Sequence, residues 1–343
     1  MRIESKWSGG KYYNAAKLIK DEESNKKYYW GIAGSSMEVK RSPEPFLDTL
    51  SKKVVLGGNS QFRTLDQKPM IDSFEEEMIA RIAASTILTK EQLIDFMKLR
   101  GLLQPVSDSL IEPWIMERRL KKLLDLQLLE QVTISYTSGR PSHKAYRITE
   151  LGQKLAHRKG VRIHKGNMYQ TSYMRMKTGL LDTPTQAMRM LVANNIAIQL
   201  LDQFDDIERF EFMYTLHMEG EITLRTINRS ALSVIRDDGT AVLYEVIRKP
   251  DPLNQTTDDF RNYEKYITDK ISRYLTLVQR QDFAEKNSLH LETIPKLAIV
   301  AEDFNHMEEL KKLLSPFIKH HRTNERAEIL FLYDSCLEPD SAK

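Results

Sequence analysis

Residues 128–155 read LLEQVTISYTSGRPSHKAYRITELGQKL and decide the fold of the first half of the chain. From residue 131 to residue 136, apolar and hydroxyl-bearing side chains alternate, which predicts a strand with one buried face. A basic turn with a glycine and a proline follows, and residues 145–148 predict a second short strand. Thr149 can cap the helix that comes next. The order is therefore strand, turn, strand, helix.

Two amphipathic helices are predicted upstream of this hairpin. Residues 73–84 have Ser73 as the expected N-cap and three glutamates in the first turn, where the helix dipole favours negative charge. Residues 89–100 begin with Thr89 and Gln92 in the spacing of a capping box, and a glycine follows. Each helix carries an apolar stripe, so each should bury one face.

A third helix is predicted from about residue 109 or 111 to residue 126, with Pro113 in its first turn. Its apolar residues can face inward while a basic cluster points elsewhere. That basic cluster consists of Arg118, Arg119, Lys121 and Lys122. In helix-turn-helix proteins a helix of this kind lies in the DNA major groove. A solvated basic face on an ordinary core helix is the alternative.

Charge is distributed unevenly along the chain. Residues 118–165 contain twelve Lys and Arg against three acids, a net charge of +9, while the whole chain carries +3. Residues 201–343 hold 19 Lys and Arg against 27 Asp and Glu, a net charge of −8. Positive charge gathered on one segment is expected when the partner is a polyanion.

Three helices followed by a two-strand wing predict a winged helix-turn-helix domain over residues 73–160 that binds double-stranded DNA. The third helix would contact phosphates and base edges. The residues expected to reach the flanking backbone or minor groove from the wing are Arg140, Ser142, His143 and Lys144. A homodimer would read two half-sites, and the sequence leaves the oligomeric state open. The alternative to DNA binding is a winged helix that binds a protein such as a relaxase or an initiator.

The composition predicts a globular protein of the cytoplasm. The single cysteine, Cys336, cannot form an intrachain disulfide, and the sequence has no paired-cysteine zinc pattern. No stretch approaches the roughly 18 apolar residues of a membrane span, and the N-terminus lacks the pattern of a secretory signal. The eight histidines are scattered, so no metal site is predicted from them. Residues 1–72 are assigned no function.

The second half of the chain predicts an α/β domain over residues 184–335. A connector at residues 161–183 leads into it, and a tail at residues 336–343 follows it. The predicted strands are residues 208–217, 221–227, 231–236, 240–248, 296–301 and 327–333, and the predicted helices are residues 184–202, 258–281 and 304–314. Asp237, Asp238 and Gly239 predict a hairpin turn.

This order of elements is compatible with a nuclease core built around a D…ExK triad, in which two carboxylates bind a divalent metal and a lysine assists water. Glu245 is the candidate acid, but Ile247 occupies the lysine position, and the nearby lysine is Lys249. The turn aspartates are too far from Glu245 along the strands to share a metal. Catalysis is therefore expected to be lost, and no cofactor is predicted.

An active endonuclease that uses Mg²⁺ with Glu245 and Lys249 is the alternative. Such an enzyme would need another acid from elsewhere in the chain. The acids considered for this role are Asp258, Glu208 and Glu211.

The segments YRITELGQKL (146–155), TPTQAMRMLVANNIAIQLL (183–201), RSALSVIRDDGTAVLYEVIRK (229–249), FRNYEKYITDKISRYLTL (260–277) and LAIVAEDFNHMEELKKLL (297–314), with ILFLY at 329–333, resemble the replication-relaxation family of plasmid and mobile-element proteins. The resemblance implies a winged helix fused to a restriction-endonuclease-like domain that acts in plasmid replication, transfer or their control. A relaxase or a replication initiator is a possible partner. The family's acidic positions fall here on Arg229-Ser230 and on Glu245, so only the glutamate is kept.

Overall fold

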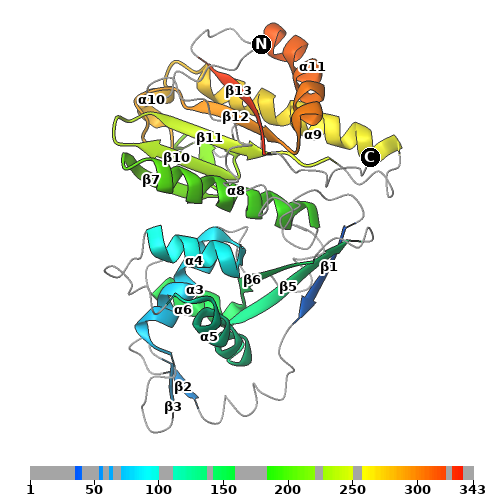
Figure 1. Ribbon diagram of the computed structural model, residues 1–343. Helices are drawn as coiled ribbons and strands as arrows, with labels where there is room; N and C mark the ends of the chain where they lie inside the picture. Colours follow the sequence, from blue (N-terminus) through cyan, green and yellow to red (C-terminus); the bar gives the residue numbers. More distant parts are fainter. Residues whose placement is uncertain are drawn as a thin grey trace. The chain divides into compact units, whose positions relative to one another are not determined.

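The computed structural model describes residues 35–40, 54–56, 62–64, 71–99, 111–136, 142–158, 184–220, 227–249, 257–321 and 327–334. The chain is a mixed α/β protein that divides into two compact units (Figure 1). Among the described residues, one unit runs from Ser35 to Asn194 and the other from Asn195 onward, so the boundary lies inside helix α8 (Pro184–Gln203). No helix in the described ranges is long and apolar enough to cross a membrane. The connector, the tail and most of residues 1–72 lie outside these ranges.

The first unit combines helices with a four-stranded antiparallel sheet. The helices are α3 (Ser73–Ser85), α4 (Lys90–Leu99), α5 (Pro113–Asp125) and α6 (Glu150–Arg158). The sheet order is β1-β5-β6-β4, from β1 (Ser35–Lys40), β5 (Leu129–Tyr136), β6 (His143–Ile148) and β4 (Leu88–Thr89). A separate pair joins β2 (Val54–Leu56) to β3 (Phe62–Thr64). The sequence did not predict β1, which adds a third strand to the β5–β6 hairpin.

Capping boxes fix where α3 and α4 begin. Asp72, and not the predicted Ser73, caps α3: its Oδ1 accepts from the Glu75 N–H at 2.8 Å, and Glu75 accepts from the Asp72 N–H at 3.0 Å. The predicted box of Thr89 and Gln92 is confirmed by hydrogen bonds of 3.2 Å in both directions. Helix α5 begins with Pro113, where a missing N–H costs no intrahelical bond.

Helix α6 approaches the chain before β5 more closely than a side chain would allow. Thr149 caps α6 as predicted, because its Oγ1 accepts from the Gly152 N–H at 3.1 Å. The same hydroxyl donates to the carbonyl of Gln127 at 2.6 Å. A Cβ added to Gly152 would lie 2.2 Å from the Leu128 carbonyl oxygen. The glycine is therefore required by packing, although it weakens the first turn of α6.

The first turns of α8 belong to the first unit. The Asn194 side chain is fully buried and donates to the carbonyl of Ile87 at 2.6 Å. The Gln92 amide of α4 donates to the carbonyl of Leu191 at 2.7 Å. The Asn194 bond joins α8 to the turn between α3 and β4, where Thr86 has a φ of 69°, and the Gln92 bond joins α8 to α4.

The second unit is built on a five-stranded sheet in the order β13-β12-β11-β10-β7. Strands β7 (Ile207–Phe212), β10 (Leu232–Arg236) and β11 (Ala241–Val246) are antiparallel, and β12 (Lys296–Ala301) and β13 (Ile329–Tyr333) continue parallel to β11. The other elements are α9 (Thr257–Val278), α10 (Phe283–Lys286), α11 (Phe304–His321), β8 (Thr215–His217) and β9 (Ile227–Arg229). The predicted strand 208–217 is divided at Met213, which has a φ of 52°.

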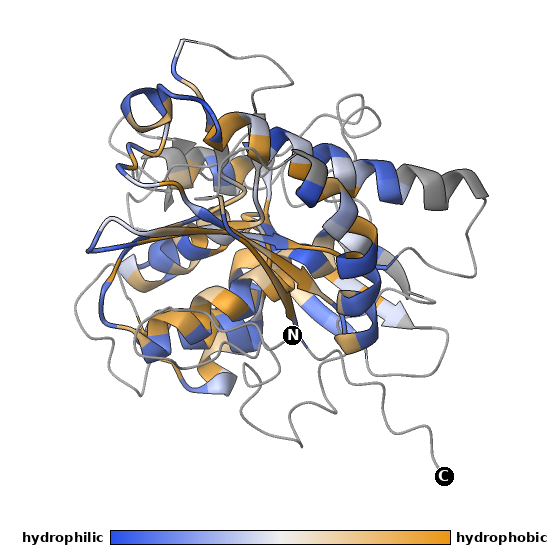
Figure 2. Ribbon diagram, turned by 90° about the horizontal axis from the view of Figure 1, so that it is seen from above, coloured by the Kyte–Doolittle hydropathy of each residue, from blue (hydrophilic) through white to orange (hydrophobic). Residues whose placement is uncertain are grey.

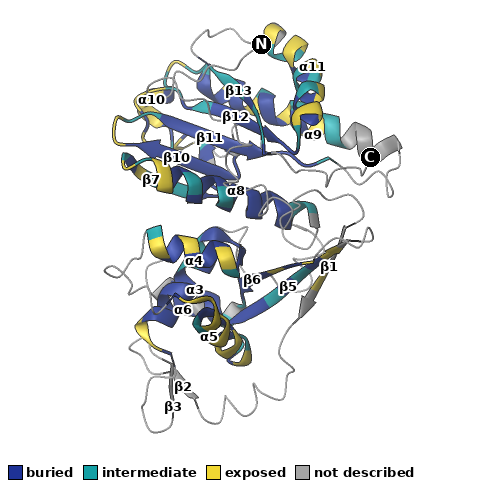
Figure 3. Ribbon diagram, viewed as in Figure 1, coloured by how far each residue is buried: buried dark blue, intermediate teal, exposed yellow. Residues whose placement is uncertain are grey.

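Helices α9 and α11 share one hydrophobic core with the five-stranded sheet. The buried residues at its centre include Leu243, Ile271, Tyr274, Ile299, Leu310 and Leu314. The strands are mainly orange in the hydropathy view of Figure 2, and β10, β11 and β12 are dark blue in the burial view of Figure 3. The predicted turn after β10 is confirmed, because Asp238 accepts from the Thr240 N–H at 2.9 Å and Gly239 has a φ of 75°.

Replacing Gly152 by alanine should destabilise the first unit, although alanine normally stabilises a helix. The added methyl group would force α6 away from the Leu128 carbonyl, and overpacking of this kind costs about 1–3 kcal/mol. Differential scanning calorimetry of Gly152→Ala measures the loss, with the exposed α5 substitution Lys121→Ala as the control that should leave the unfolding temperature unchanged. A higher unfolding temperature for Gly152→Ala would contradict the close approach.

Candidate functional site

The predicted basic cluster on α5 is divided by the fold into two pairs. Arg119 and Lys122 turn toward the N-terminus of α3. Arg119 Nη1 lies 2.6 Å from Asp72 Oδ2 and 3.3 Å from Glu75 Oε1. Lys122 Nζ lies 2.7 Å from Glu75 Oε2. We call these four residues the α3–α5 clamp. The clamp residues on α5 are thus occupied by the chain's own carboxylates.

The clamp is held by burial as well as by charge. The Glu75 side chain is 3% exposed, and the Arg119 guanidinium lies 4.8 Å from the centre of the Phe74 ring. Burial raises the pKa of Asp72, but the Arg119 hydrogen bond and the Glu75 backbone N–H outweigh it, so the pKa lies below its usual value. The Asp72 carboxylate is therefore ionised at neutral pH, and its ion pair with Arg119 helps to fix α5 against α3.

Arg118 and Lys121 form the second pair, and both are exposed. Neither makes an ion pair with a carboxylate within the described part of the chain. The opposite side of α5 faces the core through Met116, Leu120 and Leu123, which are at most 1% exposed. Figure 3 accordingly shows much of α5 in yellow. Two cations of the predicted four therefore have no carboxylate partner within the described part of the chain.

Only some of the residues predicted to bind DNA from the wing are exposed on the β5–β6 hairpin. Ser142 and Lys144 are exposed. The sequence places His143 on the wing surface as well, but its side chain is 5% exposed, which corrects that expectation. The reason is the alternation of side chains along β6, which directs His143 inward when its neighbour Lys144 points out. Arg140 lies outside the described residues.

In the second unit, Glu245 on β11 forms an ion pair with a lysine that the sequence did not predict as its partner. Lys270 Nζ, from α9, lies 2.5 Å from Glu245 Oε2, and the Tyr266 hydroxyl donates to Glu245 Oε1 at 3.2 Å. Glu245 is 2% exposed. Lys249 Nζ instead lies 3.3 Å from Glu309 Oε2 on α11. The structure therefore gives Glu245 and Lys249 different ion-pair partners.

The other acids considered for a nuclease site do not reach Glu245. Glu208 and Glu211 are on β7, which β10 separates from β11, a distance of roughly 10 Å across two strand spacings. The Asp258 side chain lies outside the described residues. Ser230 stands where the resemblance expects an acid, and its hydroxyl is 2.9 Å from that of Ser233. Among the described residues no three acidic, histidine or cysteine side chains are arranged to hold a metal ion.

A polar cluster lies where the three parallel strands end. Arg248, after β11, forms an ion pair with Asp334, after β13. Glu302, after β12, accepts from the Lys249 N–H at 2.9 Å. His306 on α11 accepts from the Glu302 N–H at Nδ1, at 3.2 Å, and its Nε2 is 2.6 Å from the Tyr263 hydroxyl oxygen. These contacts join the ends of neighbouring strands to α9 and α11.

Burial controls the protonation of this cluster. It raises the pKa of Glu302 to about 7, a rise that the positive charge of Arg248 only partly offsets. Burial also lowers the pKa of His306 to about 3, helped by the charges of Lys249 and Arg248. His306 is therefore a neutral imidazole, and Glu302 is the group that titrates near neutral pH.

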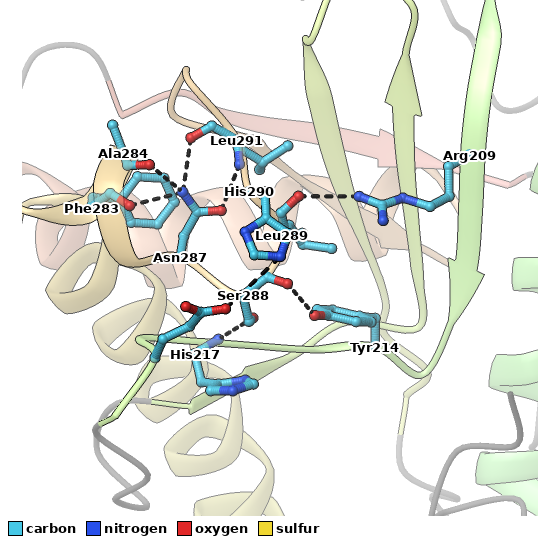
Figure 4. Close-up of polar contacts among 11 residues, drawn as sticks. Arg209, Tyr214, His217, Phe283, Ala284, Asn287, Ser288, Leu289, His290 and Leu291 are labelled. Carbon is cyan, nitrogen blue, oxygen red and sulfur yellow. Dashed lines mark hydrogen bonds and ion pairs between the residues drawn. The ribbon is translucent and has the colours of Figure 1, made fainter.

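A second polar network fixes the loop after α10 (Figure 4). The Asn287 amide donates to the carbonyls of Phe283 and Leu291 at 2.8 Å, and Asn287 Oδ1 accepts from the Leu291 N–H at 2.8 Å. The Tyr214 hydroxyl donates to the carbonyl of Ser288 at 2.6 Å. Since these side-chain groups bond the main chain, the network shapes the loop and offers no binding chemistry of its own.

No protein-family model, curated protein or solved structure matches the chain. The function is therefore inferred from the geometry of these groups.

The stability of the second unit should fall as pH rises from about 4.5 to about 7. Glu302 has a pKa above its ordinary value in the folded chain, so folding favours the protonated form, and that contribution is lost as the pH rises through the folded pKa. Glu302→Gln should remove this dependence and stabilise the unit at pH 8 by at most about 3 kcal/mol. Unfolding followed by denaturant across the pH range measures it.

The control for the pH experiment is Glu309→Gln, since the Glu309 side chain lies on α11 and is 64% exposed. It should keep the wild-type pH dependence. An unchanged pH dependence in Glu302→Gln would show that another group titrates.

Proposed function

We propose that residues 71–158 form a winged helix-turn-helix domain that binds double-stranded DNA through α5 and the β5–β6 hairpin. The order α3, β4, α4, α5, β5, β6 supports this assignment, as does the pairing of β4 with β6 beside β5. In such a domain α4 and α5 are the helix-turn-helix pair, and the second helix of the pair enters the major groove.

The observation that carries the proposal is the pair of exposed cations on the outward side of α5. Arg118 and Lys121 lie opposite the buried side of the helix and have no carboxylate partner in the described ranges. Lys144 is exposed on the hairpin that follows. Each such cation can replace a counterion at a DNA phosphate, which is the main source of affinity in DNA binding.

The α3–α5 clamp also supports DNA binding by Arg118 and Lys121. Arg119 and Lys122 hold α5 in place and leave Arg118 and Lys121 available to a ligand. Because the clamp already fixes α5, the helix itself need not be ordered when the ligand binds, which lowers the entropic cost of binding. Phosphate contacts are accordingly assigned to Arg118, Lys121 and Lys144, with Ser142 as a further hydrogen-bonding group.

The second unit is proposed to be a restriction-endonuclease-like scaffold without catalytic activity. The antiparallel β7-β10-β11 meander, followed by α9 and the parallel strand β12, supports the fold. The loss of catalysis is supported by the ion pair of Glu245 with Lys270 and by the buried Ile247, which stands at the position of the catalytic lysine. The net charge of −8 over residues 201–343 would repel DNA from this part of the chain.

The resemblance to the replication-relaxation family supports a cytoplasmic role for this DNA binding in replication, transfer or transcriptional control of a mobile element. A relaxase or a replication initiator would then be a protein partner. A homodimer would read two half-sites one helical turn apart.

Replacing Arg118 and Lys121 together by alanine should weaken duplex binding and flatten its salt dependence. Two phosphate contacts account for a slope of about 2 in the plot of log affinity against log salt. Fluorescence anisotropy with a mixed-sequence duplex at several salt concentrations measures the slope. Lys265→Ala with Lys312→Ala removes two exposed lysines of the second unit and should keep the wild-type slope. An unchanged slope in the α5 variant would remove this helix from the interface.

Neither the wild-type chain nor Glu245→Gln should cut plasmid DNA in the presence of Mg²⁺ or Mn²⁺. Glu245→Gln should instead destabilise the second unit by about 3 kcal/mol, because it removes the carboxylate that faces a buried lysine. Agarose gels and thermal unfolding measure the two effects, and Glu245→Gln combined with Lys270→Met should recover most of the stability. Metal-dependent cleavage that disappears in Glu245→Gln would show that the unit is an enzyme.

A further inference from the structure

Trp114 is unusual for its position on α5. It is 59% exposed, one of three large hydrophobic residues with high exposure in the described part of the chain. It is the second residue of α5, and Arg118 and Lys121 follow at the i+4 and i+7 positions, on the same side of the helix. The apolar residues that anchor α5 face the other way. Trp114 therefore adds little to the core of the first unit.

The indole ring is nevertheless held in a defined orientation. Its Nε1–H donates to the Glu112 carboxylate, and the Arg118 guanidinium carbon lies 5.7 Å from the ring centre. Because the only polar group of the ring is already engaged, the exposed remainder offers hydrocarbon and π surface. A partner of Trp114 must therefore supply an apolar group, and it must lie beside two cations.

We infer that Trp114 contacts the 5-methyl group of thymine in the DNA major groove and gives the protein a preference for sites that contain thymine. The inference rests on the proposed DNA binding by α5. The N-terminal residues of a recognition helix are those that reach base edges, and Trp114 occupies that part of α5. The thymine methyl is the apolar group that the major groove presents. An exposed indole on the same side of α5 as Arg118 and Lys121 matches this combination of hydrocarbon and phosphate.

Deoxyuridine tests the methyl contact directly, since it differs from thymidine in the major groove only by lacking that group. The probes are an alternating adenine–thymine duplex and the same duplex made with deoxyuridine, and the full chain is titrated against each. We expect the wild-type chain to bind the thymine duplex about fourfold more tightly for each methyl group contacted. Trp114→Ala should bind both duplexes equally.

Two matched variants separate this contact from general effects. Arg118→Ala with Lys121→Ala should bind both duplexes more weakly and retain their ratio. Phe304→Ala removes another exposed aromatic residue, 55% exposed in the second unit, and should behave as wild type. The unfolding temperature of Trp114→Ala should match that of the wild-type chain, since the ring lies outside the core.

A spectroscopic signal provides an independent measurement. Phenylalanine in place of Trp7 and Trp30 leaves Trp114 as the single tryptophan. Its emission should be quenched when the thymine duplex is added, and unchanged emission would contradict the contact.

Equal binding of the two duplexes by the wild-type chain, or a preserved preference in Trp114→Ala, would overturn the inference. In that case the proposed function would still hold if DNA binding depends on salt and is weakened by Arg118→Ala with Lys121→Ala. Failure of the wild-type chain to bind either duplex at low salt would overturn both.

Discussion

The ion pairs between α5 and the start of α3 are the constraint on which the first unit depends. Glu75 closes the capping box of α3 and also meets Arg119 and Lys122, so one buried carboxylate both starts a helix and holds another. Breaking a buried pair from one side leaves an uncompensated charge, which is far more destabilising than losing a surface contact. The clamp thereby fixes which side of α5 faces outward, and the exposed cations follow from it.

The second unit uses buried charge in a different way. Glu245 faces Lys270 inside the domain, and Arg248 faces Asp334 where the parallel strands end. In open α/β sheets, ligands commonly bind beyond the carboxyl ends of the strands. Here that edge is occupied by the chain's own groups, and a neutral His306 with its tyrosine partner completes the arrangement. The polar side chains at that edge therefore bond to one another.

Local signals in the sequence predicted much of the fold. The Thr89 capping box, the Thr149 cap and the turn at Gly239 each depend on residues within a few positions, so the sequence alone identifies them. Contacts between residues far apart in the sequence could not be predicted from these local signals. The Lys122–Glu75 pair joins residues 47 positions apart, and it is this contact that separates two cations of α5 from the other two. The lysine beside Glu245 was missed for the same reason, since it comes from the following helix.

The sharing of α8 between the two units has a practical consequence for dissecting the protein. A fragment cut at residue 160, where the sequence alone would end the domain, would lack the carbonyl that accepts from Gln92 and the amide that donates to Ile87. Losing the partners of buried polar groups costs about 1–3 kcal/mol each. An expressible piece of the first unit should therefore extend at least through Asn194, whose side chain seals the turn after α3.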